Sequence, residues 1–256
     1  MENEAVAPPA YPIESVDKAL RLLIMLQEQS FIRVAEAGEA LGVARSTAHR
    51  LLAMLQYHGF VVHDPDARSY RPGPRLIEIG LNAVRNMNIR TIGLGPIERL
   101  SRELDETVHI AILAGADVLF VAAFESTFAL RAADRTGWRL PVSATAAGKV
   151  ILSQMEMEDV RQIVPDPLAA PTPASITSWA ELESELVQAR RQGYATNFGE
   201  SERDLVAVAA PILDPGGRVR GAVTVTSPST RADRAWVRKV APPTIATATE
   251  IGARLG

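Results

Sequence analysis

The amino-acid sequence predicts an α+β protein in which a small helical domain with a β-hairpin is joined by a helix to a larger domain with an antiparallel sheet. The chain has 256 residues, a length typical of one large or two ordinary domains. Helical periodicity dominates its first part, whereas β-prone runs alternate with separate helices from Thr107 onward. We therefore expect a flexible N-terminal arm at 1–12, a first domain at 13–74, a linker helix at 75–90 and a second domain at 91–256.

The composition indicates a globular protein with a packed core. Hydrophobic residues make up 47% of the chain and charged residues 22%, and the formal net charge is −3. No uncharged apolar run reaches the roughly 18 residues of a membrane span, and residues 1–12 carry two acids and no base, unlike a secretory signal. Cysteine is absent, which excludes disulfides, thiolate metal sites and a cysteine nucleophile. We expect a cytoplasmic protein.

The first domain begins with two predicted helices. Prolines within residues 1–12 disfavour helix there, and Ser15 is expected to cap a first helix that runs to about Gln27. A second, shorter helix is expected over about Val34 to Leu41. Gly42 can end it, because glycine readily adopts a positive φ.

The stretch from Gly42 to Phe60 predicts a third, amphipathic helix over about Ala44 to His58. One face carries an apolar stripe, and the opposite face is polar and basic: Arg45, Ser46, His49, Arg50 and Tyr57. Such a helix can lie in a DNA major groove, although a solvated surface helix has the same pattern.

A β-hairpin is expected directly after the third helix. Two short β-prone runs, at 60–63 and 69–71, flank a turn that contains Asp64, Pro65 and Asp66. Three helices followed by a hairpin predict a winged helix-turn-helix whose wing carries Arg68 and Arg71. Between Gly42 and Arg75 the sequence has five arginines and two aspartates, a local basic balance that suits DNA. The alternative is a small domain of the same shape that binds a protein.

The remaining elements are predicted from periodicity and turn residues. Pro72-Gly73-Pro74 marks a boundary, and the apolar stripe of the helix from Arg75 to about Met87 indicates a dimer contact. The second domain is expected to contain a hairpin at 108–123, a possible strand at 128–131, helices at 143–154, 157–164 and 178–192, strands at 205–213 and 218–226, and a terminal helix at 235–255 broken or kinked at Pro242-Pro243.

Motifs for catalysis are missing from the sequence. It contains no HExxH, no GxSxG and no GxxxxGK[ST], and its four histidines lack metal-like spacing. We therefore predict no catalytic residue, no metal site, no cofactor and no enzymatic activity.

A ligand pocket is expected in the second domain. Residues 145–148 place small side chains at a helix start, and helix N-termini stabilise anions. Thr224 and Thr226 alternate along one strand and therefore point to one face, where buried hydroxyls need a hydrogen-bond partner. A ligand, a water molecule or the backbone can supply it, and ordinary β-propensity also explains the threonines.

Several motifs in order resemble the IclR family of bacterial transcriptional regulators, from about Ser15 to Ser227. They read SVDKALRLL, ALGVARSTAHRLL, SYRPGPRLIEIG, ELDETVHIAIL, RLPVSATAAGKVIL, GYATNFGES and VAAPILDPGGRVRGAVTVTSP. The resemblance implies a winged helix-turn-helix DNA-binding domain, a linker helix and a GAF-like effector domain. It implies a homodimer or a tetramer (a dimer of dimers) on a (pseudo)palindromic double-stranded operator, with a small-molecule effector in the second domain.

The resemblance also implies residue roles. DNA would be faced by Arg45, Ser46, Thr47, His49 and Arg50, with Arg68 of the wing on the backbone. The effector would be bound by Ala146, Ala147, Asn197, Leu205, Ala207, Thr224 and Thr226, with apolar walls from Phe128, Leu130, Trp138 and Leu140.

Three positions that depart from the family pattern indicate a less polar pocket. Asn197 stands where an acidic residue is frequent, and Ala207 and Pro211 stand where some members have cysteine or polar groups. The expected effector is an organic acid or an aromatic metabolite. The sequence leaves open the identity of the effector, the operator, repression against activation, and dimer against tetramer.

Overall fold

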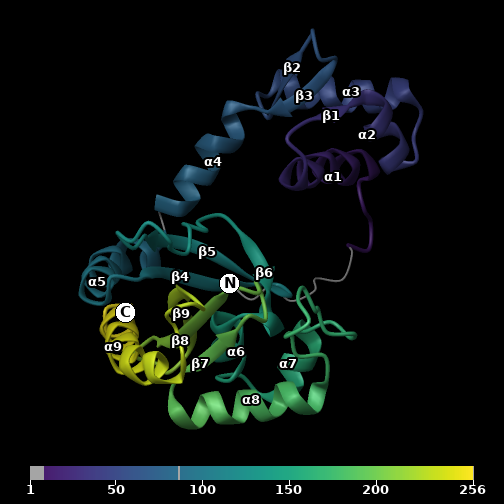
Figure 1. The fold of residues 1–256 in the computed structure, drawn as a ribbon. Helices are drawn as coiled ribbons and strands as arrows, with labels where there is room; N and C mark the ends of the chain where they lie inside the picture. The colour runs from purple at the N-terminus through teal and green to yellow at the C-terminus, as the bar shows by residue number, and fades with distance from the viewer. Residues whose placement is uncertain (1–8, 86, 256) are drawn as a thin grey trace. The chain divides into compact units, whose positions relative to one another are not determined.

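The structure is a computed structural model that describes residues 9–85 and 87–255 (Figure 1). The described residues divide into two compact units, one up to residue 85 and one from Met87 onward. Residues 1–8 of the predicted N-terminal arm lie outside the described residues, and 9–12 are exposed. Among the described residues, no helix is long and apolar enough to cross a membrane.

The N-terminal unit is a winged helix-turn-helix, as predicted. Its helices are α1 (Glu14–Glu28), α2 (Val34–Leu41) and α3 (Arg45–Tyr57), followed by the hairpin of β2 (Val61–Asp64) and β3 (Ser69–Pro72) and by α4 (Pro74–Arg85). A two-residue strand, β1 (Ile32–Arg33), completes an antiparallel sheet of order β1-β3-β2.

Local sequence explains the turn between α2 and α3. Gly42 has φ +63° and caps α2, and Val43 N–H donates to the Gly38 carbonyl at 2.9 Å. The turn buries the apolar stripe of α3, Ala48, Leu52 and Leu55, in the domain core. The predicted cap at Ser15 was wrong: α1 begins at Glu14, and Ile13 holds the cap position without a side-chain hydrogen bond.

The helix predicted as a linker over 75–90 is divided between two elements. α4 ends at Arg85, and α5 (Asn88–Leu104) begins in the second unit. Three apolar side chains on α4 are exposed, at 60% for Ile77, 51% for Ile79 and 59% for Leu81. Exposed apolar side chains on one chain are a surface that a second protein can cover.

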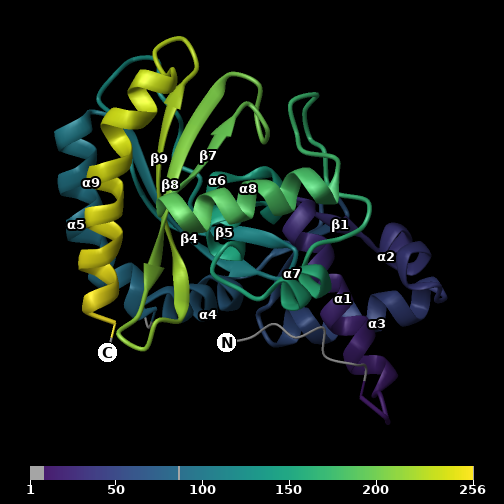
Figure 2. The same ribbon diagram turned by 90° about the horizontal axis from the view of Figure 1, so that it is seen from below.

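The C-terminal unit is an α+β domain around a six-stranded antiparallel sheet of order β6-β5-β4-β9-β8-β7, which confirms the predicted fold class. The strands are β4 (Thr107–Ala114), β5 (Asp117–Phe124), β6 (Arg139–Pro141), β7 (Ala195–Phe198), β8 (Leu205–Leu213) and β9 (Val219–Pro228). α5 and α9 (Arg234–Ala253) cover one face of the sheet, and α6 (Ala146–Leu152) and α8 (Trp179–Gln192) cover the other (Figure 2). A 3₁₀ turn (Val142–Ala144) precedes α6, and α7 (Met157–Ile163) follows it.

Three sequence predictions in this domain were incomplete or wrong. Residues 128–130 form bends and residue 131 is irregular, so the predicted strand is not present, and strand β7 was not predicted. α9 runs continuously through Pro242 and Pro243. Proline removes a helical hydrogen bond, but Val240, Ala241 and other residues of α9 are buried, and this packing outweighs the local preference.

Candidate nucleic-acid interface and ligand pocket

The predicted DNA-facing residues of α3 form an exposed surface. This α3 surface consists of Arg45, Ser46, Thr47, His49 and Arg50. All five residues are exposed, whereas Ala48 between them is buried. Among the described residues, no carboxylate forms an ion pair with the side chain of Arg45 or Arg50. Two unpaired guanidinium groups on one helix face can bind phosphates or hydrogen-bond to base edges.

The wing turn is held in shape by Asp64. Its carboxylate accepts hydrogen bonds from the Asp66 and Ala67 amides, both at 3.1 Å, and pairs with Arg71 at 2.7 Å. The Ala67 amide, helped by Arg71, lowers the pKa of the Asp64 carboxyl. Arg68, at the tip, has φ +48°, is exposed, and has no ion-pair partner among the described residues. Of the two wing arginines, Arg68 is therefore the one whose charge is not neutralised.

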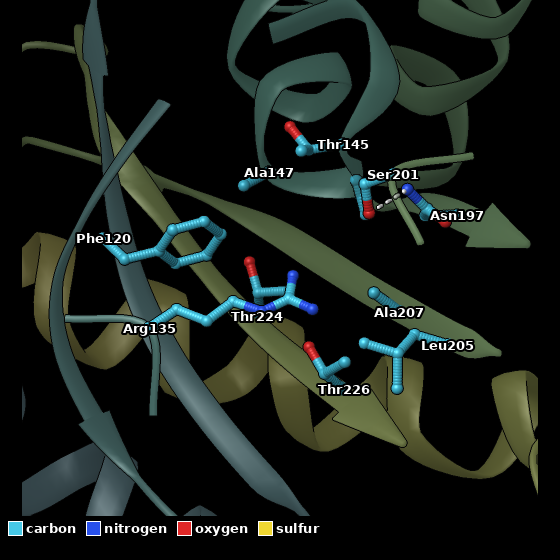
Figure 3. A pocket seen from close by; sticks show the side chains of 11 residues that line it. Phe120, Arg135, Thr145, Ala147, Asn197, Ser201, Leu205, Ala207, Thr224 and Thr226 are labelled. Atoms are coloured by element: carbon cyan, nitrogen blue, oxygen red, sulfur yellow. Dashed lines mark hydrogen bonds between the residues drawn. The ribbon is translucent and has the colours of Figure 1, made fainter. Parts of the chain in front are cut away.

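A candidate ligand pocket lies between α6 and the strands β8 and β9 of the sheet (Figure 3). Its cavity measures about 20 Å³, which is room for about one water molecule. The lining residues are Phe120, Arg135, Thr145, Ala146, Ala147, Asn197, Ser201, Leu205, Ala207, Thr224 and Thr226. Backbone pairing explains part of this set, because Ala207 lies opposite Thr226 across β8 and β9.

The Asn197 side chain connects the segment before α6 to the β7–β8 loop. Its side-chain Nδ2 donates to the Ala144 carbonyl at 2.6 Å, and its Oδ1 accepts from the Glu200 amide at 3.0 Å. A further bond to Ser201 Oγ, at 3.3 Å, is drawn in Figure 3. A carboxylate could not donate to Ala144, which gives a physical reason for an amide at this position.

The start of α6 is less open to a ligand than the sequence indicated. Thr145 caps the helix, and its Oγ1 accepts the Gly148 amide at 3.0 Å. A Cβ on Gly148 would meet the Val142 carbonyl at 2.0 Å, so the close approach requires glycine. One of the amides that we expected to be available is therefore already used.

Two polar atoms on the pocket side of the sheet lack partners. Thr224 Oγ1 and His109 Nδ1 are buried without a hydrogen bond in the described structure, and the two residues are paired across β4 and β9. Burial, reinforced by the nearby Arg135 charge, lowers the pKa of His109 to about 4. The imidazole is therefore neutral at physiological pH, and the unpaired Thr224 hydroxyl remains available to a small molecule.

The only charged side chain that lines the described pocket is Arg135. It is 7% exposed, and its Nη2 pairs with Glu202 Oε1 at 2.7 Å. Burial lowers the pKa of the Arg135 guanidinium, and Glu202 opposes that effect. The arginine nonetheless stays charged, because its ordinary pKa is far above neutral.

A second buried cation lies on α6. Lys149 Nζ pairs with Glu200 at 2.7 Å and with Glu185 at 3.3 Å, and its side chain is 1% exposed. Burial raises the pKa of the Glu200 carboxyl, while Lys149 opposes the rise. This cluster joins α6, α8 and the β7–β8 loop, which carries pocket residue Ser201. In the described part of the chain, no three His, Cys, Asp or Glu side chains come together to hold a metal.

The structure brings seven of the predicted effector residues to this pocket: Ala146, Ala147, Asn197, Leu205, Ala207, Thr224 and Thr226. It places the four predicted apolar walls elsewhere: Phe128, Leu130 and Trp138 are about half exposed or more, and Leu140 packs against the core beside α6.

Sequence reasoning did not include Phe120, Arg135, Thr145 or Ser201 among the effector residues. Thr145 had a readable signal, since it precedes the helix start that we had singled out. Phe120 belongs to a predicted strand, but its face could not be decided. Arg135 and Ser201 lie in irregular segments with no periodic pattern.

A winged helix-turn-helix domain with an exposed basic helix, joined to an α+β domain, defines the class of DNA-binding transcriptional regulators. Residues 15–65 match the family model of the IclR helix-turn-helix domain, and residues 81–253 match that of the bacterial transcriptional regulator IclR C-terminal domain. The chain belongs to the IclR family of bacterial transcriptional regulators.

Individual relatives agree with this assignment. The chain is 34% identical to the HTH-type transcriptional regulator XynR of Escherichia coli, over 87% of this chain and 89% of XynR. It is 28% identical to the transcriptional repressor IclR of the same species, over 89% and 84%. The crystal structure of an IclR transcriptional regulator from Alicyclobacillus acidocaldarius superposes with a TM-score of 0.83 at 26% identity, covering 96% of this chain and all of that one. All three are named as regulators of transcription.

Proposed function

We propose that this regulator binds a (pseudo)palindromic operator through the α3 surface and the wing, and that a small organic acid or aromatic metabolite in the ligand pocket alters that binding. DNA binding is supported by two exposed arginines without ion-pair partners among the described residues, Arg45 and Arg50. They lie on the side of α3 that faces away from its buried apolar residues. Thr47, Ser46 and His49 complete the surface with groups that can hydrogen-bond to bases or phosphates.

We propose a dimer or a dimer of dimers as the operator-binding form. A palindromic site presents the same half-site twice, so it requires two recognition helices. The exposed apolar residues of α4, Ile77, Ile79 and Leu81, support a contact between copies. Such a regulator acts in the cytoplasm, where bacterial DNA is found. Two relatives are named repressors, so repression is the first direction to test.

The lining supports an effector that is part apolar and part polar. Phe120, Leu205 and Ala207 offer apolar contacts, and Thr224, Arg135 and Asn197 offer polar ones. A cavity of about 20 Å³ must widen to admit an aromatic ring. If calorimetric titration shows glyoxylate or pyruvate binding far more tightly than every aromatic acid, the proposal of an aromatic effector fails.

The DNA half is tested by selecting fragments that the full chain retains from a random library and measuring their affinity by gel shift. We expect one recurring palindromic sequence and a steep loss of affinity with salt. The rival function, an adaptor whose winged helix binds a protein, predicts no recurring sequence.

The ligand half is tested with Thr224→Val, which removes one hydroxyl and keeps the shape of the side chain. Operator affinity should stay unchanged while the response to effector is lost, because the hydroxyl has no other partner in the described structure. Effectors are first found by a thermal-shift screen of small metabolites. Loss of operator binding together with the response would assign the residue a structural role.

A further inference from the structure

The ligand pocket contains a buried cation whose partner can leave. Arg135 is 7% exposed, and it belongs to the segment between β5 and β6. Its backbone amide donates to His109 Nε2 at 3.4 Å, which fixes the start of the side chain beside the sheet. Figure 3 shows the side chain extending past Phe120 toward Thr224, so the guanidinium reaches into the pocket.

The ion pair between Arg135 and Glu202 is asymmetric. The Arg135 side chain is 8% exposed, whereas the Glu202 side chain is 44% exposed. A buried charge without a partner is costly, but a carboxylate at the surface can return to water at little cost. The buried Arg135 guanidinium therefore requires an anionic partner in every state of the protein, whereas another carboxylate can replace Glu202 as that partner.

Within the described structure, the Arg135 guanidinium has free hydrogen-bond donors for a second carboxylate. A guanidinium has five N–H donors, and among the described residues Glu202 is the one acceptor that the Arg135 guanidinium meets. Thr224, which also lines the pocket, is 4% exposed. Its hydroxyl has no hydrogen-bond partner among the described residues. A planar carboxylate can accept two parallel bonds from a guanidinium and a third from a hydroxyl.

We propose that Arg135 is the carboxylate-binding residue of the ligand pocket, and that Glu202 is an internal carboxylate that competes with the ligand for it. The ligand is then a monocarboxylate whose carboxylate takes the place of Glu202 at the guanidinium and accepts a hydrogen bond from Thr224. This inference rests on the proposed function, in that it requires the pocket to bind a small molecule.

Competition between Glu202 and a ligand carboxylate for Arg135 predicts how substitutions change ligand affinity. Glu202→Gln removes the competitor and keeps the side-chain size, so it should raise the affinity for monocarboxylates, by up to about fivefold for a partly exposed ion pair. Arg135→Gln should lower that affinity by more than about tenfold. A neutral amide with the same body as the carboxylate should gain nothing from Glu202→Gln.

A matched control is present in the same domain. Glu185 is 39% exposed and also pairs with a buried cation, Lys149, but neither residue lines the pocket. Glu185→Gln should therefore leave carboxylate binding unchanged. If it raises the affinity as much as Glu202→Gln does, a general change of charge explains the gain and the proposal is wrong.

The experiment uses the full chain and thermal shift at constant ionic strength, with acetate, pyruvate and benzoate as probes and acetamide, pyruvamide and benzamide as their neutral counterparts. Each shift is compared with the same variant without ligand, and apparent affinities come from the concentration dependence. The proposal is supported if Glu202→Gln responds to a carboxylate at lower concentration than the wild type while its response to the amide is unchanged.

Three results would overturn it: no carboxylate stabilises either protein, the Glu202→Gln variant binds carboxylates no better than the wild type, or Arg135→Gln binds them equally well. If Arg135→Gln does not fold, the Glu202→Gln comparison decides alone. If neutral metabolites bind and alter operator affinity while carboxylates do neither, the proposed function is supported but the carboxylate-binding role of Arg135 is wrong. If no small molecule of any charge alters operator binding, the proposed function itself fails.

Discussion

Arg50 on the α3 surface and Arg135 in the ligand pocket are both arginines that we expect to meet an anion, but their surroundings are opposite. Arg50 is exposed and has no ion-pair partner among the described residues. Arg135 is buried and already neutralised by Glu202 at 2.7 Å. The first charge is hydrated and accessible, whereas the second is enclosed and reached only through a small cavity.

The difference matches the size of the two expected partners. DNA is a rigid polyanion that cannot enter a pocket, so the residues that meet it must lie on the surface, and its binding releases counterions. A small molecule can enter, and a buried cation binds its carboxylate where salt screens little. Operator affinity should therefore fall steeply with salt, and effector affinity should fall much less.

Asn197→Ala should destabilise the C-terminal unit by about 2–4 kcal/mol, because it leaves the Ala144 carbonyl and the Glu200 amide without partners. All three tryptophans of the chain lie in this unit, at 138, 179 and 236. Urea unfolding followed by tryptophan fluorescence therefore reports on it alone. Gln188→Ala on exposed α8 is the control, and it should change stability by less than about 0.5 kcal/mol. A loss below about 1 kcal/mol for Asn197→Ala would show that the pocket does not depend on its amide.

Acidification should destabilise the same unit through His109. Its pKa is about 4 in the folded protein and about 6.5 when unfolded. The unfolded state binds more protons between these values, so stability is complete above about pH 6.5 and is lost as the pH falls toward 4. We expect a loss of about 2 kcal/mol between pH 7 and pH 5.

His109→Gln removes this titration, so its stability should fall less over the same range. The neighbouring charged groups Arg135, Asp134 and Glu125 are common to both proteins, and their own titration therefore cancels in the comparison. Parallel pH curves for the two proteins would show that folding does not lower the pKa of His109.

Arg50→Ala should weaken binding to the selected operator by about 1–3 kcal/mol, the range for an arginine that reads a base. Arg102→Ala is the matched control, because Arg102 is an exposed arginine of the C-terminal unit, with a side chain 78% exposed. Fluorescence anisotropy with labelled operator measures both. Unchanged affinity of a folded Arg50→Ala protein would mean that this face of α3 does not meet DNA.

Arg68→Ala should have the smallest effect, a uniform weakening on every DNA sequence. A wing arginine on the phosphate backbone contributes charge without reading bases, and its loss should lower the slope of log affinity against log salt by about 1. Titrations of operator and unrelated DNA at several salt concentrations give both slopes. A loss confined to the operator would instead assign Arg68 to base recognition.

Most of the N-terminal unit was predictable because its signals are local. Gly42 ends α2, and the spacing of Ala48, Leu52 and Leu55 defines which face of α3 is buried and hence which face carries Arg50. Errors there were small, such as the cap at Ser15. At the start of α2 the Arg33 amide donates to the Glu36 carboxylate at 3.0 Å. Glu36 is the usual residue at this position of a capping box, but arginine is not a usual N-cap residue, so the start of the helix could not be foreseen.

Local patterns predicted only part of the set of residues that line the cavity, and Asn197 came from the family resemblance. Thr224 and Thr226 follow from strand alternation, whereas Arg135 sits in an irregular segment whose path depends on the whole fold. Phe128, Leu130 and Trp138 show the opposite error. Their apolar side chains suggested a buried wall, but folded proteins leave many such residues exposed.

The most direct test of the account measures the affinity of the full chain for its selected operator with and without the monocarboxylate that gives the largest thermal shift. In the wild type, the effector should change operator affinity by about fivefold or more, the usual range of coupling between two sites. In Arg135→Gln, operator affinity without effector should equal that of the wild type. At an effector concentration that half-saturates the wild type, the change in operator affinity should be nearly lost, because the variant binds the carboxylate more than about tenfold more weakly. Operator affinity that is unaffected by the bound effector in the wild type would contradict the claim that the ligand pocket controls the α3 surface.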